Sequence, residues 1–174
     1  MGQLASFNLM QWVEDNRHLL KPPVLNKPVF VDSDFIVMIV AGPNVRTDYH
    51  VDPYEEFFFQ LEGNMTLKTV ENGELREVPI NEGGVLLLPP KVPHSPQRPE
   101  PGSIGLVVER TRPAGVMDGF EWYCTGCATQ IHHRDVHVAN IVEDLPPVFE
   151  EYYGTVADGV CPNCDTPNPK KAAA

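Results

Sequence analysis

Short apolar runs separated by turn residues dominate the middle of the chain. Seven of them have the length and β-rich composition of strands, and they lie at residues 29–31, 35–40, 56–61, 65–70, 75–80, 85–88 and 104–108. Glu71-Asn72-Gly73-Glu74 predicts a hairpin, because Asn-Gly supplies the positive φ angles of a type I′ turn. Many short antiparallel strands with Gly and Pro turns are typical of a barrel or jelly roll. The 18 prolines fit such a mainly β protein better than a helical bundle.

An amphipathic helix is predicted over residues 7–20. Apolar residues recur there with the 3.6-residue period of a helix, and Asn16 falls on the same face. Ser6 or Asn8 can cap its start, and Pro22-Pro23 prevents its continuation. We expect this helix to cover one side of the β-structure.

The composition changes after Arg112-Pro113. Residues 118–174 hold all four cysteines and half of the histidines. One helix is predicted around 145–153, beginning near Asp144 with Pro146 in its first turn and ending at Gly154, and the tail 168–174 is predicted to be disordered. The chain therefore divides into an N-terminal helix and connector (1–27), a β-barrel (28–112) and an extension folded around cysteines (113–174).

The chain is acidic, with 13 basic and 24 acidic residues and a formal net charge of −11. This balance disfavours binding to nucleic acid or to an anionic membrane, because phosphates would be repelled. The N-terminus has no basic segment followed by an apolar stretch, and no apolar run approaches the roughly 20 residues that span a bilayer. We expect a cytoplasmic protein without a membrane partner, whose thiols are reduced and indicate metal rather than disulfides.

Three residues form a candidate metal triad. His50 lies in a loop flanked by Pro and Asp just before the strand that begins at Glu56, and His94 follows a buried strand that ends in Pro-Pro. Two neutral imidazoles and one carboxylate form a facial ligand set that holds Fe(II) and leaves coordination positions open. Three other carboxylates compete for the ion, and we expect them beside the metal or at the surface: Asp48, Asp52 and Glu55.

The spacing of two stretches resembles the two motifs of the cupins, small β-barrels whose paired hairpins direct ligands into the barrel mouth. The stretches read Gly42-x5-Asp48-x-His50-x5-Glu56-x6-Gly63 and Gly83-x5-Pro89-x-Lys91-x2-His94-x3-Arg98. Three positions depart from the cupin pattern: Asp48 replaces a histidine, Lys91 a glycine and Arg98 an asparagine. The lost histidine reduces a four-ligand set to the triad, which suits an iron oxygenase with open positions. The resemblance implies a cupin (jelly-roll) barrel over residues 28–112.

Further strings resemble the 3-hydroxyanthranilate 3,4-dioxygenase family of bacteria and fungi. They are Leu20-Lys-Pro-Pro-Val24, Gly42-Pro-Asn-x-Arg-Thr-Asp-Tyr-His50, Leu88-Pro-Pro, His94-Ser-Pro-Gln-Arg-Pro99, Val108-Glu-Arg and Trp122-Tyr-Cys, within a similarity that runs over residues 8–165. The resemblance implies ring opening of 3-hydroxyanthranilate by O2 and nonhaem Fe(II), with the substrate chelated to iron. The product, 2-amino-3-carboxymuconate semialdehyde, cyclises to quinolinate, a precursor of NAD in the kynurenine route.

The same resemblance assigns roles to individual residues. It places Fe(II) on His50, Glu56 and His94, the substrate carboxylate between Arg46 and Arg98, and the amino and hydroxyl groups near Glu109. A guanidinium clamps a carboxylate with two hydrogen bonds of fixed geometry. Glu109 either accepts a proton or holds the amine by a hydrogen bond. Arg110 and Arg112 are expected to be structural, and the family implies a homodimer.

The four cysteines form two CxxC knuckles. Cys124-Thr-Gly-Cys127 and Cys161-Pro-Asn-Cys164 predict a closed tetrahedral site for structural Zn or Fe. Rubredoxin-like knuckles commonly have glycine after the second cysteine, whereas Ala128 and Asp165 stand there. Three nearby histidines can ligate metal in principle, but with four cysteines available we interpret them as surface or structural residues: His132, His133 and His137.

Two alternatives to ring cleavage of 3-hydroxyanthranilate are open from the sequence. One is a cupin dioxygenase for another amino- or hydroxy-substituted aromatic acid. The other is a metal-binding cupin that senses a small acid without turnover. The open ligand triad together with Arg46, Arg98 and Glu109 favours an enzyme that acts on a small aromatic amino-hydroxy acid and O2.

Overall fold

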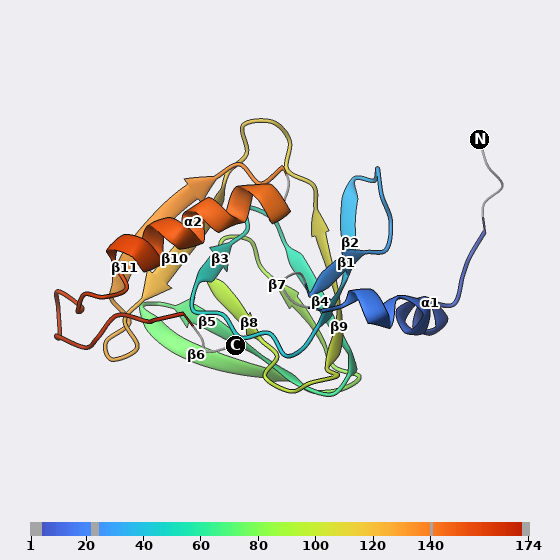
Figure 1. Ribbon diagram of the computed structural model, residues 1–174, viewed down its shortest axis with the longest axis horizontal. Helices are drawn as coiled ribbons and strands as arrows, with labels where there is room; N and C mark the ends of the chain where they lie inside the picture. Colours follow the sequence, from blue (N-terminus) through green and yellow to red (C-terminus); the bar gives the residue numbers. More distant parts are fainter. Residues whose placement is uncertain (1–4, 22–24, 140, 172–174) are drawn as a thin grey trace.

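Two antiparallel sheets form a jelly-roll barrel (Figure 1). The computed structural model describes residues 5–21, 25–139 and 141–171, without the side chains of residues 141 and 142. One sheet has five strands in the order β1 (Asn26–Pro28), β2 (Phe35–Ala41), β9 (Ile104–Arg110), β4 (Glu56–Glu62) and β7 (Val85–Leu88). The other has six, in the order β11 (Gln130–Val136), β10 (Asp118–Tyr123), β3 (Tyr49–Val51), β8 (His94–Gln97), β5 (Met65–Glu71) and β6 (Glu74–Ile80). The predicted fold class is confirmed.

Strand alternation places both the core and the polar site on the inner faces of the sheets. Phe58 on β4, Leu67 on β5 and Val107 on β9 belong to one buried cluster that joins the two sheets. Glu56 and Glu109 lie two residues from Phe58 and Val107 on the same strands, so they face the same interior. The polar residues are therefore inside the barrel because they keep the inward register of the core.

The N-terminal helix is confirmed in a shorter form than the predicted 7–20. α1 spans Leu9–Asn16 and a 3₁₀ turn, η1, follows at Arg17–Leu19. The Asn8 side chain caps the helix by accepting a hydrogen bond from the Gln11 amide at 3.0 Å. Val13 is fully buried against apolar residues of β2 and β9, so the helix covers the outer side of the five-stranded sheet. The predicted stop at Pro22-Pro23 lies outside the described residues.

The predicted hairpin and the first predicted strand have opposite outcomes. The hairpin is confirmed, since Asn72 and Gly73 have φ angles of 53° and 79°. The strand predicted at 29–31 is wrong, because β1 ends at Pro28 and Val31 is exposed in the loop that follows. The sequence pattern also missed β3, β8, β10 and β11. The first two are short and carry polar residues inward, and the last two carry many charged and polar residues, so none has an apolar strand pattern.

The C-terminal region continues the six-stranded sheet and covers it with one helix. α2 spans Ile141–Thr155, so it begins before the predicted start near Asp144 and contains Pro146 in its interior. It lies across β10 and β11 (Figure 1), where the Tyr152 ring stacks on Trp122 with centroids 4.2 Å apart. In the described part of the chain no helix is long and apolar enough to cross a membrane.

The prediction of a disordered tail is wrong for residues 168–171. Asn168 is buried and donates a side-chain hydrogen bond to the Val156 carbonyl at 2.8 Å. The Tyr152 hydroxyl donates to the Pro169 carbonyl at 3.0 Å. These contacts hold the segment against the end of α2. Residues 172–174 lie outside the described part of the chain.

Candidate active site and metal centres

A cavity of about 570 Å³ opens between the two sheets. Apolar side chains from β2, β4, β9 and β10 form part of its wall, among them Met38, Phe58 and Val107. All the polar residues singled out at the barrel mouth also line it: Arg46, His50, Glu56, His94, Arg98 and Glu109. The β1–β2 loop and the start of α2, through Leu145, border the same cavity. The structure thus brings together residues from distant parts of the sequence in a chamber with an apolar body.

The candidate metal triad converges at this cavity. His50 on β3 lies directly opposite His94 on β8, and Glu56 begins β4 in the other sheet. One ligand atom from each residue lies within 4.8 Å of the others. Glu56 Oε2 is buried, lies 2.7 Å from His94 Nε2, and makes no hydrogen bond of normal geometry. Two donor atoms this close without a hydrogen bond between them fit a shared cation, so the residues present suit a metal.

Backbone and ring contacts orient the two histidines. His94 Nδ1 lies 3.0 Å from the Val92 carbonyl, which fixes the proton on that nitrogen and leaves the lone pair of Nε2, which faces Glu56, free to bind a cation. The His50 ring stacks on Phe120, with centroids 5.2 Å apart, and meets His94 edge to face. The imidazoles are held for coordination before any ion binds.

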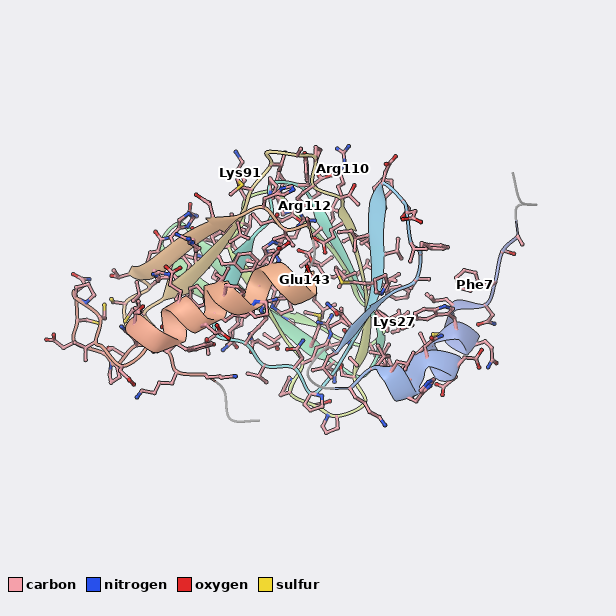
Figure 2. All side chains as sticks on the ribbon, turned by 45° about the horizontal axis from the view of Figure 1, so that its top comes forward. Phe7, Lys27, Lys91, Arg110, Arg112 and Glu143 are labelled. Carbon is pink, nitrogen blue, oxygen red and sulfur yellow. The ribbon has the colours of Figure 1, made fainter. Side chains whose placement is uncertain are left out.

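A buried ionic network surrounds the triad, and its centre is a residue that the sequence analysis treated only as structural. The Arg112 side chain is 4% exposed and pairs with Asp52 (2.7 Å), Glu109 (2.6 Å) and Asp118 (2.7 Å). Asp118 Oδ1 also lies 2.8 Å from His50 Nε2. Arg112 lies at the same end of the molecule as Lys91 and Arg110 (Figure 2).

Asp118 was missed by sequence reasoning, although it lines the cavity and contacts a predicted ligand. The only available signal was its position two residues before Phe120 on a strand that had itself been missed. His50, Asp52 and Asp118 also lie close enough to form a second group of potential ligands. Of the competing carboxylates named above, Asp48 and Asp52 are buried and paired with arginines, whereas Glu55 is exposed.

The two glutamates in the cavity have opposite pKa shifts. Burial raises the pKa of Glu109 to about 8, with the charge of Glu56 acting in the same direction and Arg112 opposing it. Burial acts to raise the pKa of Glu56 as well, but His94, His50 and Arg112 outweigh it, so that pKa lies below its usual value. At neutral pH Glu56 is therefore a carboxylate, the form that binds a cation, whereas Glu109 is protonated in a large share of molecules.

The two cavity arginines differ in their partners. Arg46 is half-buried and pairs with Asp48, whose charge keeps the pKa of Arg46 above its usual value against the effect of burial. Arg98 is 2% exposed, and no carboxylate of the described residues lies within 4.0 Å of it. Its Nε is buried and has no hydrogen-bond partner among the residues that the structure describes, and burial lowers the pKa of Arg98 to about 10. A buried cation without a counter-ion is costly, so its position at the cavity points to an anionic ligand.

The four cysteines form a second, separate candidate metal site. Their sulfur atoms lie within 4.8 Å of one another, with Cys124 Sγ 3.4 Å from Cys164 Sγ and Cys127 Sγ 3.6 Å from Cys161 Sγ. These distances exceed the roughly 2.05 Å of a disulfide and fit thiolates around one ion. Among the described residues, no histidine forms a hydrogen bond to a cysteine sulfur; the histidines near the cluster contact other groups.

The two knuckles repeat the same local structure. Each reads C-x-x-C-x-T, and the first cysteine amide of each donates to the threonine carbonyl at 2.8 Å. Backbone amides of Gly126 and Asn163 donate to the first sulfur of their knuckle at 3.3 and 3.4 Å. Ala128 and Asp165 both have φ of 58°, so they adopt the left-handed conformation that glycine usually supplies. The two knuckles therefore share one turn geometry, in which a non-glycine residue after the second cysteine takes the left-handed conformation.

Comparison with known proteins identifies the family. A model of the 3-hydroxyanthranilic acid dioxygenase family matches residues 1–153. The chain belongs to this family. Its members are dioxygenases, and the prediction of an oxidoreductase is confirmed.

Relatives of known name match nearly the whole chain. A 3-hydroxyanthranilate 3,4-dioxygenase from Ruegeria pomeroyi is 52% identical over 171 residues, which cover 98% of this chain and 95% of that protein. One from Paraburkholderia phytofirmans is 54% identical over 166 residues, 95% of each. Among solved structures, a cupin-2 domain containing protein from Shewanella frigidimarina overlaps with a TM-score of 0.47 at 15% identity, over 56% of this chain and 90% of that one. The family match ends between the two knuckles, whereas the relatives extend beyond the second.

Proposed function

We propose that this protein cleaves the ring of 3-hydroxyanthranilate with O2, giving 2-amino-3-carboxymuconate semialdehyde, and that Fe(II) is held by His50, Glu56 and His94. The observation that carries the proposal is that this triad shares one cavity with the buried Arg98, which pairs with no carboxylate of the described residues. The similarity to 3-hydroxyanthranilate 3,4-dioxygenases over nearly the full chain supports the substrate. The iron, when bound, supplies coordination positions for substrate and O2 and the electron density that O2 accepts.

Arg98 and Arg46 hold the substrate carboxylate in this proposal. Arg98 lies four residues after His94, and the alternation of β8 turns both side chains, with Pro96 between them, into the cavity. Arg98 lacks a carboxylate among the described residues, so the substrate supplies its counter-ion. Arg46 keeps Asp48 and adds a second cation at the edge. The ring then lies against apolar wall residues such as Phe58 and Val107.

Glu109 is proposed to contact the amino and hydroxyl groups of the substrate. Its carboxyl lines the cavity and is anchored by Arg112 Nη1 at 2.6 Å. The ionised fraction of Glu109 takes up the phenolic proton, and the raised pKa of about 8 favours retention of that proton near neutral pH. Arg112 and Asp118 position this carboxyl and the His50 ring. In this proposal Arg98 orients the substrate carboxylate, and Glu109 accepts the phenolic proton.

The cellular context follows from the same assignment. The product cyclises to quinolinate, which leads to NAD in the kynurenine route. We place the reaction in the cytoplasm, where thiols stay reduced and the four cysteines remain available to Fe or Zn.

A direct assay tests the proposed function. Protein reconstituted anaerobically with Fe(II) is mixed with 3-hydroxyanthranilate and O2, and O2 uptake and quinolinate are measured. We expect one O2 consumed for each substrate, since both oxygen atoms enter the product. Anthranilate, which lacks the hydroxyl group, serves as the control and is expected to consume none. Iron-loaded protein that takes up no O2 with 3-hydroxyanthranilate would exclude this function.

We also propose a homodimer, formed through the outer face of the five-stranded sheet. Phe35, Val85 and Leu87 are 55%, 62% and 56% exposed there, and a groove of about 300 Å³ runs beside Phe57 and Val108. An exposed apolar face of this kind is typical of an interface.

Leu87→Asp is expected to convert a dimer to a monomer in sedimentation analysis, whereas Val160→Asp, at an exposed site near the knuckles, should not. A wild-type monomer at micromolar concentration would refute the dimer.

A further inference from the structure

The Arg98 guanidinium occupies the space where a side chain of residue 105 would lie. Gly105 is the second residue of β9, and a Cβ built there would fall 2.5 Å from Arg98 Nη2 and 3.2 Å from Arg98 Cζ. The φ angle of Gly105 is outside the left-handed region, so backbone conformation does not require glycine. Glycine inside a strand weakens it. Glycine at position 105 is explained by the space that it leaves for the Arg98 guanidinium.

Gln60 lies beside the same guanidinium. It is directly opposite Gly105 on the neighbouring strand β4, and its Oε1 is 3.1 Å from the point that a Cβ of residue 105 would occupy. Gln60 Nε2 donates to the Ser103 hydroxyl and to the Glu62 carbonyl, each at 2.8 Å. These two bonds fix the amide, and its oxygen lies near the same point as Arg98 Nη2. That oxygen is buried and has no hydrogen-bond partner in the described structure.

We propose that Gly105 and Gln60 are positioning residues for the Arg98 guanidinium. Gly105 leaves the space in which the guanidinium lies, and the neutral Gln60 amide near it leaves the charge of Arg98 available for the carboxylate of the substrate. This inference rests on the proposed function. It adds an explanation of why Arg98 has no carboxylate partner in the described part of the chain, since Arg46 and Arg112 in the same cavity are both paired with carboxylates. Because Gln60 is neutral, it occupies this place without neutralising the cation. A carboxylate in that place would compete with the substrate.

The first variant displaces the guanidinium. Gly105→Ala puts a methyl group 2.5 Å from Nη2, so the arginine must move by about 1 Å, a displacement that costs up to about 100-fold in a well-oriented site. Dissociation constants are measured anaerobically by calorimetry on Fe(II)-loaded protein for 3-hydroxyanthranilate and for 2-aminophenol, which lacks the carboxylate. We expect at least about 10-fold weaker binding of 3-hydroxyanthranilate and less than about 2-fold change for 2-aminophenol. Gly154→Ala, where nothing lies within 4 Å, is the matched control.

The second variant keeps the shape and changes the charge. Gln60→Glu places a carboxylate beside Arg98, and we expect the same selective loss of at least about 10-fold for 3-hydroxyanthranilate. Gln130→Glu at an exposed position of β11 controls for the added charge. If Gly105→Ala does not fold, Gln60→Glu tests the proposed positioning role on its own. If the folded variant binds both ligands equally more weakly, or neither more weakly, the proposed positioning role of Gly105 and Gln60 is wrong. Wild-type protein that fails to bind 3-hydroxyanthranilate instead overturns the proposed function.

Discussion

His94→Ala is expected to lose the iron of the active site and to lower O2 uptake with 3-hydroxyanthranilate by at least about 100-fold, while the metal on the four cysteines remains. Only His50 and Glu56 would be left to hold the ion, and two ligands do not form the facial set that iron requires. His94 is 1% exposed and its Nε2 is 2.7 Å from Glu56 Oε2, so the loss also removes the group that lowers the pKa of that glutamate.

Metal analysis of purified protein, with O2 uptake measured on the same samples, checks this result. The wild-type protein should contain one active-site iron and one metal at the cysteines, and the variant only the latter. His18→Ala, which removes an exposed imidazole on η1, is the matched control and should retain both. Active-site iron or activity that persists in His94→Ala would show that another ligand set, such as the one with Asp118, holds the ion.

Cys124→Ser is expected to lower soluble yield, metal content and thermal stability together. The sulfur of Cys124 is fully buried, and the two knuckles join the β10–β11 turn to the segment that follows α2. That join holds Tyr152 on Trp122 and Phe149 on Phe120, which in turn stacks on His50. A closed site of this type contributes directly to folding free energy. A loss of about 3 kcal/mol lowers the melting temperature of a domain of this size by roughly 6–12 °C.

The measurement is thermal unfolding by circular dichroism, with metal content determined on the soluble fraction. Thr125→Ser changes an exposed residue of the same knuckle without touching a sulfur, and it should behave like the wild type. The folded fraction of Cys124→Ser should still carry iron at His50, Glu56 and His94, because the two centres share no ligand. A soluble, fully active variant with unchanged stability would refute a structural role for the cysteines.

Much of the fold was readable from local patterns. Six of the seven predicted strands exist, because apolar alternation over four to seven residues depends on neighbours along the chain. Those missed, such as β3 and β10, present His50, Asp118 or charged residues and have no apolar pattern. Their pairing depends on partners that are distant in sequence, since β3 joins β8 and β10. The order of the tail likewise depends on contacts with α2.

The order of residues along the chain sets which side chains are available for chemistry: the triad, the arginines and the two knuckles, whose spacing is a property of the chain. Which of their charges are compensated depends on the three-dimensional fold. Arg112 meets carboxylates from residues 52, 109 and 118, whereas Arg98, equally buried, meets none among the described residues and lies in the space left by Gly105. Ion pairs in a low-dielectric interior depend on separations of a few ångströms between segments far apart in sequence, and folding alone sets those distances.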